Sequence, residues 1–383
     1  MKKIGKAIAK GRYLIFILAL ALLVPSAIGY LNTRVNYDIL SYLPESLETV
    51  KGQDIMVDEY GMGAFSMVVV ENMELKDVQK LEKKFEAVDH VKDVLWYDDV
   101  ADLNLPVQMI PKKLREGFFK GNATMMIVLF DNTTSSDESM NAVAEMRKLA
   151  NKQCFISGMS GVVNDIKDVA LDELPVYVVI AAVLSFLVLE FTTESFLVPV
   201  FFLLSIGIAI IYNLGSNVFL GQVSYITKAL TAVLQLGVTM DYSIFLLDAY
   251  MNWRDTGLSE EKAIVKAVEE AINSIFASSL TTVVGFLALV TMKFNIGFDM
   301  GLVLAKGIIF SLLTVVLFMP AMILKFTRWN DKTKHRSFFP DFTRLGRGVY
   351  RIRHLVLAAV LLITPPAYVA PQMNNFQYGN SAV

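Results

Sequence analysis

Seven long apolar runs constrain this chain more than any other feature of its sequence. They lie at residues 13–31, 174–190, 195–215, 224–247, 275–292, 300–325 and 354–371. A helix needs about 20 mainly apolar residues to cross a bilayer core, and the second run is the shortest. Because 19% of the residues are charged although the mean hydropathy is +0.49, the runs must alternate with water-exposed segments. We predict a polytopic α-helical membrane protein with about seven membrane-spanning helices.

The positively charged residues predict the orientation of these helices. One basic group precedes the first run, and a second segment, 326–353, separates the sixth run from the seventh. The first group consists of Lys2, Lys3, Lys6, Lys10 and Arg12. Cytoplasmic flanks are enriched in Lys and Arg, and six crossings place both groups on the same side. We therefore expect a cytoplasmic N-terminus with a first helix in 1–31, a cytoplasmic linker at 326–353, and an extracytoplasmic segment at 32–173.

Strand and helix patterns alternate within 32–173. Apolar, β-branched runs predict strands at 65–71, 91–97, 123–130 and 153–157, and helical periods predict helices at 75–88 and 136–150. Two such βαβ-like units favour an α+β ferredoxin-like domain of the porter type between the first two membrane helices. The domain either lines a path beside the membrane or is a purely structural ectodomain.

A membrane bundle is expected over 174–325, interrupted by an amphipathic segment at 258–274. Ser259 is a plausible N-cap, and the acidic Glu260 and Glu261 follow it at the positive end of the helix. An apolar stripe follows, formed by Ala263, Ile264, Ala267, Val268, Ala271 and Ile272. We interpret 258–274 as a cytoplasmic interfacial helix that lies against the bundle.

A short pattern near the N-terminus recurs late in the chain. The basic pair at 10–12, Pro25 and Tyr37 return at 351–353, Pro366 and Tyr378 with the same offset. A cleaved signal peptide at 1–31 is the alternative for the first run, but a leader has no reason to recur. We interpret 354–383 as a seventh membrane helix and the start of a second, missing repeat. The expected partner is a second transporter half, fused downstream or supplied by dimerisation.

Composition excludes several classes of function. A single cysteine, Cys154, rules out a disulfide framework or a thiolate zinc cluster, and three histidines make a histidine-rich metal site improbable. No phosphate-binding loop of the Gly-x-x-x-x-Gly-Lys-Ser/Thr type is present, so we expect neither ATP hydrolysis nor another enzymatic activity. No basic, aromatic-interleaved patch suggests nucleic acid as a partner. We expect no metal and no cofactor.

Asp241 is the residue that indicates a function. It lies inside the fourth run, and a carboxylate at that depth costs several kcal/mol unless it is protonated, paired or hydrated. Burial favours its protonated form, so such a carboxyl can load and unload a proton. Tyr242 supplies a neighbouring hydroxyl about a quarter-turn away, and Gly237, one turn away, would allow another helix to approach. The alternative is that Asp241 only hydrogen-bonds a neighbouring helix.

Further polar residues are possible accessory members of this site. Asp248 lies two turns beyond Asp241 and marks either a hydrated exit or a solvated helix end. Lys306 in the sixth run is either a counter-ion or a lysine that snorkels to the outer surface. Hydroxyls in the fifth run could be partners in the bundle, although such groups often bond to their own backbone; they are Ser278, Ser279, Thr281 and Thr282.

Four segments resemble the MMPL-type branch of the resistance-nodulation-division (RND) superfamily, specifically the N-terminal half of its exporters. Gly-Val-Thr-Met-Asp-Tyr-Ser-Ile-Phe-Leu-Leu at 237–247 resembles the family's fourth-helix motif, and 278–286, 301–307 and Leu43-Pro44-Glu45 resemble other family segments. The resemblance implies that Asp241 and Tyr242 form a proton relay, and that a proton gradient drives hydrophobic or lipid-like substrates outward. It also implies a plasma (inner) membrane location among membrane lipids.

Two other functions stay open at this point. One is a non-transporting lipid- or sterol-sensing scaffold, which would bind a lipid without any dependence on the proton gradient. The other is a helper of protein translocation similar to SecD and SecF. SecD and SecF tend to have Asp-Ala-Asn where this chain has Asp-Tyr, which disfavours a role as a translocation helper.

Overall fold

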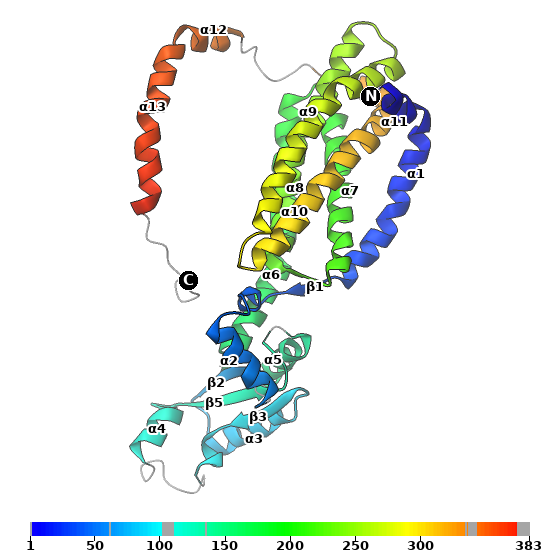
Figure 1. Ribbon diagram of the computed structural model, residues 1–383. Coiled ribbons are helices and arrows are strands. Elements are labelled where there is room, and N and C mark those ends of the chain that lie inside the picture. Colours follow the sequence, from blue (N-terminus) through cyan, green and yellow to red (C-terminus); the bar gives the residue numbers. More distant parts are fainter. Residues whose placement is uncertain are drawn as a thin grey trace.

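A bundle of long helices and an α+β domain form the two ends of the molecule (Figure 1). The computed structural model describes residues 2–60, 63–101, 111–134, 136–333, 335 and 343–373. Tyr378, which completes the expected repeat, and 336–342 of the basic linker lie outside the described residues. The remaining elements can be compared with the sequence-based expectations.

Among the described residues, seven helical segments are long and apolar enough to cross a membrane, as predicted. They are Gly5–Asn32, Met159–Thr192, Leu197–Leu220, Tyr225–Asp255, Glu260–Leu289, Ile296–Asn330 and Arg353–Met373. The corresponding helices are α1 (Lys2–Asn32), α6 (Met159–Thr192), α7 (Leu197–Gly215), α8 (Tyr225–Asp255), α9 (Glu260–Leu289), α10 (Ile296–Leu313) with α11 (Met319–Lys332), and α13 (Arg353–Val369). The chain is therefore a mostly helical, multi-pass membrane protein.

The separate interfacial helix expected at 258–274 is absent as an independent element. Its residues form the first half of α9, which has 30 residues and runs unbroken into the fifth span. No proline or glycine separates the amphipathic residues from the apolar ones before Gly285, so nothing ends the helix between them. The predicted apolar stripe does pack on the bundle, because Ala263, Ala267 and Val268 are buried.

The boundary expected at residue 173 also differs, since α6 begins 15 residues earlier than the apolar run. Its first turns pack against β2 and α5 of the α+β domain, and Val163 and Asn164 there are buried. The same helix continues past Pro175 into the membrane segment. Domain and bundle are thus connected by one continuous helix of 34 residues.

The α+β domain contains the predicted strands and helices. They are β2 (Ala64–Glu71), α3 (Leu75–Glu86), β3 (Val91–Leu95), β5 (Ala123–Phe130), α5 (Asp137–Leu149) and β6 (Cys154–Ser157). The strands are antiparallel in the order β3-β5-β2-β6, and the short β4 (Phe119–Lys120), which follows α4 (Lys112–Phe118), pairs with β5. Residues of β2 alternate between buried and exposed, and the helices α3 and α5 share one core with the buried face. Helix α2 (Glu48–Asp58) precedes the sheet and was not predicted.

A two-stranded parallel sheet lies where the domain meets the bundle. It pairs β1 (Arg34–Asn36), directly after α1, with β7 (Gln222–Ser224), directly before α8. This small sheet fixes the end of α1 beside the start of α8. Ser224 then caps α8, because its hydroxyl accepts a hydrogen bond from the Ile226 amide at 3.2 Å.

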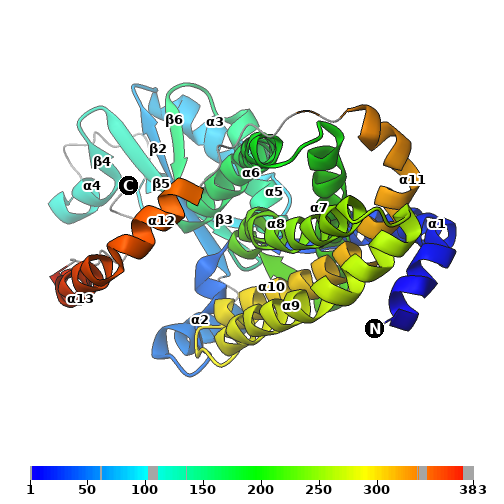
Figure 2. The ribbon, with the colours of Figure 1, turned by 90° about the horizontal axis from the view of Figure 1, so that it is seen from above.

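Inside the bundle, α8 lies between α7, α9 and α10, and it contacts all three (Figures 1 and 2). Helix α1 packs on α7 where Gly29 meets Gly215, and a Cβ on either glycine would collide with the backbone of the other helix. A π-helical segment, η5 (Thr314–Phe318), joins α10 to α11. Helix α13, reached through α12 (Thr343–Arg351), has no buried residue and stands apart from the bundle in Figure 1.

Candidate functional site

Helix α8 places Asp241 on one side of an open groove that it forms with α9. The groove has a volume of about 390 Å³ and is lined by Val233, Leu234, Gly237, Val238, Asp241, Tyr242, Ser278 and Thr282. Gly237 and Asp241 are one turn apart, so both present the same face of α8. The structure thus brings together five of the predicted site residues, two of them from α9.

The two adjacent residues of the Asp-Tyr pair have different surroundings. The Asp241 side chain is exposed at the groove, whereas Tyr242 is 3% exposed and belongs to the bundle core. The Tyr242 hydroxyl is buried, and it has no hydrogen-bond partner in the described part of the chain. The phenol therefore has unused hydrogen-bonding capacity inside the bundle core, beside the groove.

The helix approach expected at Gly237 does not occur within this chain. A Cβ at Gly237 would meet no atom within 4 Å of it, so this face of α8 is uncovered among the described residues. Asp241 is likewise not enclosed by the helices of its own bundle. The Asp241 carboxyl, which was expected to be buried, is instead exposed on the outer side of the α8–α9 pair.

The predicted hydroxyl partners mostly bond within α9. Ser279 donates to the carbonyl of Phe276 at 3.0 Å, and Thr282 donates to that of Ser278 at 3.1 Å. This is the backbone bonding that makes hydroxyls common in membrane helices. Ser278 is exposed at the groove, while Asp248 is exposed further along α8 and does not line it.

Lys306 lies elsewhere, inside the bundle between α10 and α7. Its Nζ donates to the Asn213 carbonyl at 3.1 Å and to the Asn217 Oδ1 at 2.6 Å. The amine therefore points at the end of α7 and at the turn that follows it, and the two interpretations, a counter-ion or a snorkelling lysine, stay predictions. Lys306 also does not line the groove of Asp241, so the structure does not pair these two charges.

The largest departure from the sequence-based site is a buried polar stripe along α8. Its five members recur at every fourth position and are at most 2% exposed: Thr227, Thr231, Gln235, Thr239 and Ser243. Residues four apart lie above one another on a helix, so the stripe forms one line along α8. We refer to it below as the polar ladder. Thr239 and Ser243 each lie about 200° around the helix from Asp241, so this part of the ladder faces away from the carboxyl.

Gln235 joins the ladder to the neighbouring helices. Its Nε2 donates to the Gly307 carbonyl at 3.1 Å and to the Ser311 hydroxyl at 2.9 Å, and its Oε1 accepts from Asn213 at 3.1 Å. A Cβ at Gly307 would collide with the Asn213 side-chain amide, so a larger residue there would have to displace Asn213 from its bond to Gln235. Thr239 continues the line by donating to Ser311 at 2.9 Å.

Asp299 closes the ladder at the end that faces the α+β domain. One carboxylate oxygen accepts hydrogen bonds from the Ser224 amide at 2.7 Å and from the Thr227 hydroxyl at 2.8 Å. The residue is 7% exposed. Asp299 and Lys306 are two turns apart on α10: the buried acid bonds a ladder residue directly, and the half-buried amine bonds Asn213, the partner of Gln235.

Sequence reasoning missed the ladder although part of its signal was present. The five polar residues at four-residue steps on α8 are visible in the sequence. Such a regular series is longer than the scattered single hydroxyls that are common in membrane helices. Its partners Asn213, Asp299 and Ser311 come from α7 and α10, and only the packed bundle brings them to α8.

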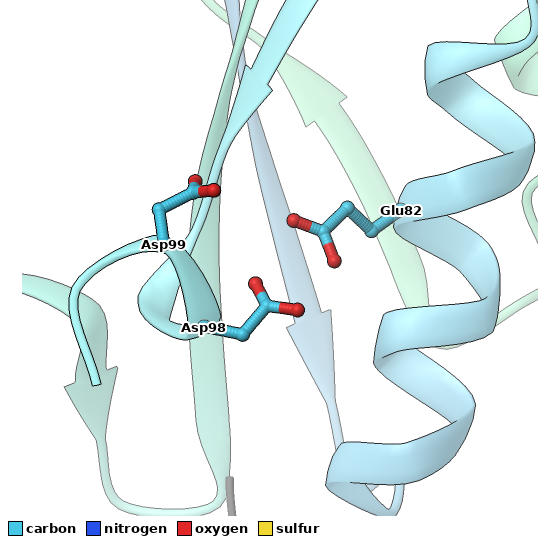
Figure 3. A group of neighbouring side chains, drawn as sticks. All are labelled: Glu82, Asp98 and Asp99. Carbon is cyan, nitrogen blue, oxygen red and sulfur yellow. The ribbon is translucent and has the colours of Figure 1, made fainter. Parts of the chain in front are cut away.

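A separate acidic group lies in the α+β domain. Figure 3 shows Glu82 of α3 facing Asp98 and Asp99 of the turn after β3, and one oxygen from each lies within 4.8 Å of the others. Glu82 is 4% exposed, and burial together with the neighbouring Asp98 raises its pKa to about 8. Such oxygens suit a hard cation, so in the described part of the chain this is the group that could hold a metal ion.

Comparison with known proteins identifies relatives over most of the chain. A family model described as "MMPL family" matches residues 55–351. A putative membrane protein of Methanocaldococcus jannaschii is 37% identical over 122 residues, which is 32% of this chain and 31% of the relative. A putative membrane protein of Streptomyces coelicolor is 28% identical over 257 residues, 62% of this chain and 29% of that protein.

The probable transport protein MmpL12 of Mycobacterium tuberculosis is similar over a longer stretch. It is 23% identical over 323 residues, which cover 81% of this chain and 27% of that protein. The matched part of this chain therefore spans about a third or less of the length of the curated relatives it resembles.

Proposed function

Because this chain belongs to the MMPL family, we propose that it is the proton-coupled half of a membrane transporter of the RND type. The observation that carries the proposal is Asp241, a carboxyl in the middle of the membrane helix α8 that opens into a groove beside Tyr242. An ionisable residue in such a position is costly unless it has a function. The proton gradient is the energy source, and no cofactor takes part.

Asp241 and Tyr242 act as the relay in this proposal. The carboxyl exchanges a proton with water in the groove, where Ser278 and Thr282 supply further polar groups. The Tyr242 hydroxyl, buried and without a partner among the described residues, is placed to accept or donate when the groove is covered. The polar ladder behind it holds α8 in register with α7 and α10 while the groove face changes partners.

The group that covers the groove is a second transporter half, fused downstream or contributed by another copy. Support comes from the open face at Gly237, the exposed Asp241 and the unpartnered Tyr242, which lie together on one side of the bundle. A second bundle docked there would exclude lipid from the relay. It would also offer the phenol a hydrogen-bond partner.

The α+β domain is the extracytoplasmic, porter-type part of the same machine in the plasma membrane. The strand order β3-β5-β2-β6, with α3 and α5 on one face, supports the ferredoxin-like interpretation. Helix α6 and the β1–β7 sheet connect this domain to the bundle at two points. Through them a movement of α8 during the proton cycle would reach the domain that handles a hydrophobic or lipid-like substrate.

The proposal is tested in everted membrane vesicles from cells that express the full-length gene product. A pH gradient should drive uptake of a phospholipid with a fluorescent tail, and Asp241→Asn and Tyr242→Phe should abolish that uptake. Asp255→Asn, at the exposed end of α8, is the matched control and should transport as the wild type does. Undiminished gradient-driven uptake by Asp241→Asn, at equal protein level, refutes the relay.

A further inference from the structure

A second, basic site lies at the opposite end of the bundle from the α+β domain. There the start of α1 crosses the start of α9 and the two helices line an open pocket of about 800 Å³. Five cationic side chains line it: Lys6, Lys10, Arg12, Lys262 and Lys266. Neither the relay nor the polar ladder includes any of these residues, so the proposed transport mechanism does not account for them.

Specific contacts hold the two walls of this basic pocket together. Gly5 packs against Val265, where an added Cβ would come within 3.1 Å of the α9 backbone. Seven residues further along α1, Arg12 forms an ion pair with Glu261 at 3.0 Å. The two helix starts therefore cross in contact with each other, and cations from both line the pocket.

The pocket carries an excess of positive charge. Its two carboxylates are already engaged, Glu261 with Arg12 and Glu269 with Lys266 at 3.7 Å. Lys6, Lys10 and Lys262 have no ion pair in the described part of the chain. Three ammonium groups on two helices line one pocket, which suits an anion with several oxygens, such as a phosphate ester.

Apolar surface continues from the pocket along both helices. On α1 the stripe that begins with Lys6 and Lys10 continues with Tyr13, Ile17, Leu20 and Val24, which are 46–63% exposed. On α9 the stripe that begins with Lys262 and Lys266 continues with Phe276, Leu280, Val284 and Leu287, which are 44–58% exposed. The α1 positions follow the three- and four-residue spacing of one helix face, and so do the α9 positions on either side of a ten-residue step from Lys266 to Phe276.

The order of residues along each stripe matches an amphiphile. Cations come first, a polar or aromatic residue follows, and aliphatic residues run on into the membrane-spanning part. Basic pockets between membrane helices bind anionic lipid head groups in this way. A free anion would use the cations but not the apolar stripes, whereas a phospholipid uses both.

We propose that the pocket between α1 and α9 is a binding site for an anionic phospholipid. The phosphate lies among Lys6, Lys10 and Lys262, and an acyl chain follows one apolar stripe. In the orientation proposed above, the lipid belongs to the cytoplasmic leaflet. Because α9 also forms one wall of the Asp241 groove, a bound lipid would steady the helix that flanks the relay.

The test uses the purified full-length protein in neutral detergent and counts bound ligand by native mass spectrometry. The probes are dioctanoyl phosphatidylglycerol, dioctanoyl phosphatidylcholine and inorganic phosphate. We expect phosphatidylglycerol to bind, and the double variant Lys10→Gln/Lys262→Gln to weaken that binding on the order of tenfold or more. Lys10→Arg/Lys262→Arg keeps the charge and should keep the affinity.

The matched control removes two cations at the same end of the bundle but outside the pocket. Arg328→Gln/Lys332→Gln on α11 fulfils this, since both side chains are exposed. An equal loss of binding in this control would show general charge attraction and overturn the proposal. Equal binding of inorganic phosphate would reassign the pocket to a free anion, and equal binding of phosphatidylcholine would exclude a site selective for anionic lipid.

Discussion

Replacing Glu82 by glutamine should remove most of the pH dependence of the stability of the α+β domain. Glu82 lies on α3 with its carboxyl 4% exposed and directed at Asp98 and Asp99 (Figure 3). Burial and these two neighbouring acids disfavour its ionised form and raise its pKa from 4.5 to about 8. The folded domain therefore keeps a proton that the unfolded chain releases.

The sign and the size of the effect follow from this difference. Between the two pKa values the folded state binds more protons than the unfolded state, so stability falls as the pH rises from about 4.5 to about 8. Above the folded-state value the loss levels off. One pKa unit corresponds to about 1.4 kcal/mol, so the loss from pH 5 to pH 8 is on the order of 3 kcal/mol.

Hydrogen–deuterium exchange of the full chain in detergent measures this directly. Peptides from β2 and α3 report the opening free energy of the domain once the intrinsic pH dependence of exchange is removed. The wild type should lose protection from pH 5 to pH 8, Glu82→Gln should lose little, and Glu145→Gln, exposed on α5, should behave as the wild type. A pH-independent wild type, or a Glu82→Gln variant with the wild-type slope, would refute the reasoning.

Three further predictions concern packing, the polar ladder and the single thiol. Gly215→Ala should destabilise the solubilised protein by about 2 kcal/mol or more, because the new Cβ meets the backbone of Ser26. Gly207→Ala on the same helix is its control, since the added Cβ there meets open space. Equal melting midpoints of the two variants would contradict the close α1–α7 contact. Gln235→Leu should cost about 1–3 kcal/mol because Asn213 and Ser311 lose their partner. Thr231→Val is its control, since Thr231 bonds only within α8, and a melting midpoint for Gln235→Leu no lower than that of the control would count against the ladder. Cys154 should react slowly with a maleimide at pH 8, because burial raises the pKa of its thiol to about 11. The reaction rate should rise about tenfold per pH unit toward that value. A rate that is already maximal at pH 8 would contradict a buried thiol.

The spans and the strands could be predicted because their signals are local. Twenty apolar residues have few alternatives to a membrane helix, and the strands of the α+β domain carry their own period. Helix ends were harder to place. Nothing in the sequence distinguishes a surface helix at 258–274 from the first half of a 30-residue helix, because no glycine or proline stands between the two parts.

The site was predicted as a set of residues but not as an arrangement. Asp241 could be found because a charge inside an apolar run is conspicuous. Its exposure in the groove depends on which helices cover α8, and the sequence does not encode that locally. The acceptors of Lys306 could not be predicted for the same reason, since Asn213 and Asn217 belong to α7 and to the turn after it.

The most direct test of the central claim is a measurement of proton movement through the reconstituted full-length protein. Vesicles containing a pH-sensitive dye receive an imposed pH gradient, and a fluorescent-tail phospholipid is then added as substrate. The account predicts that the wild type dissipates the gradient faster once the lipid is present, and that Asp241→Asn removes this lipid-dependent proton flux while Asp255→Asn retains it. A lipid-dependent proton flux of wild-type size in Asp241→Asn would contradict a relay at Asp241.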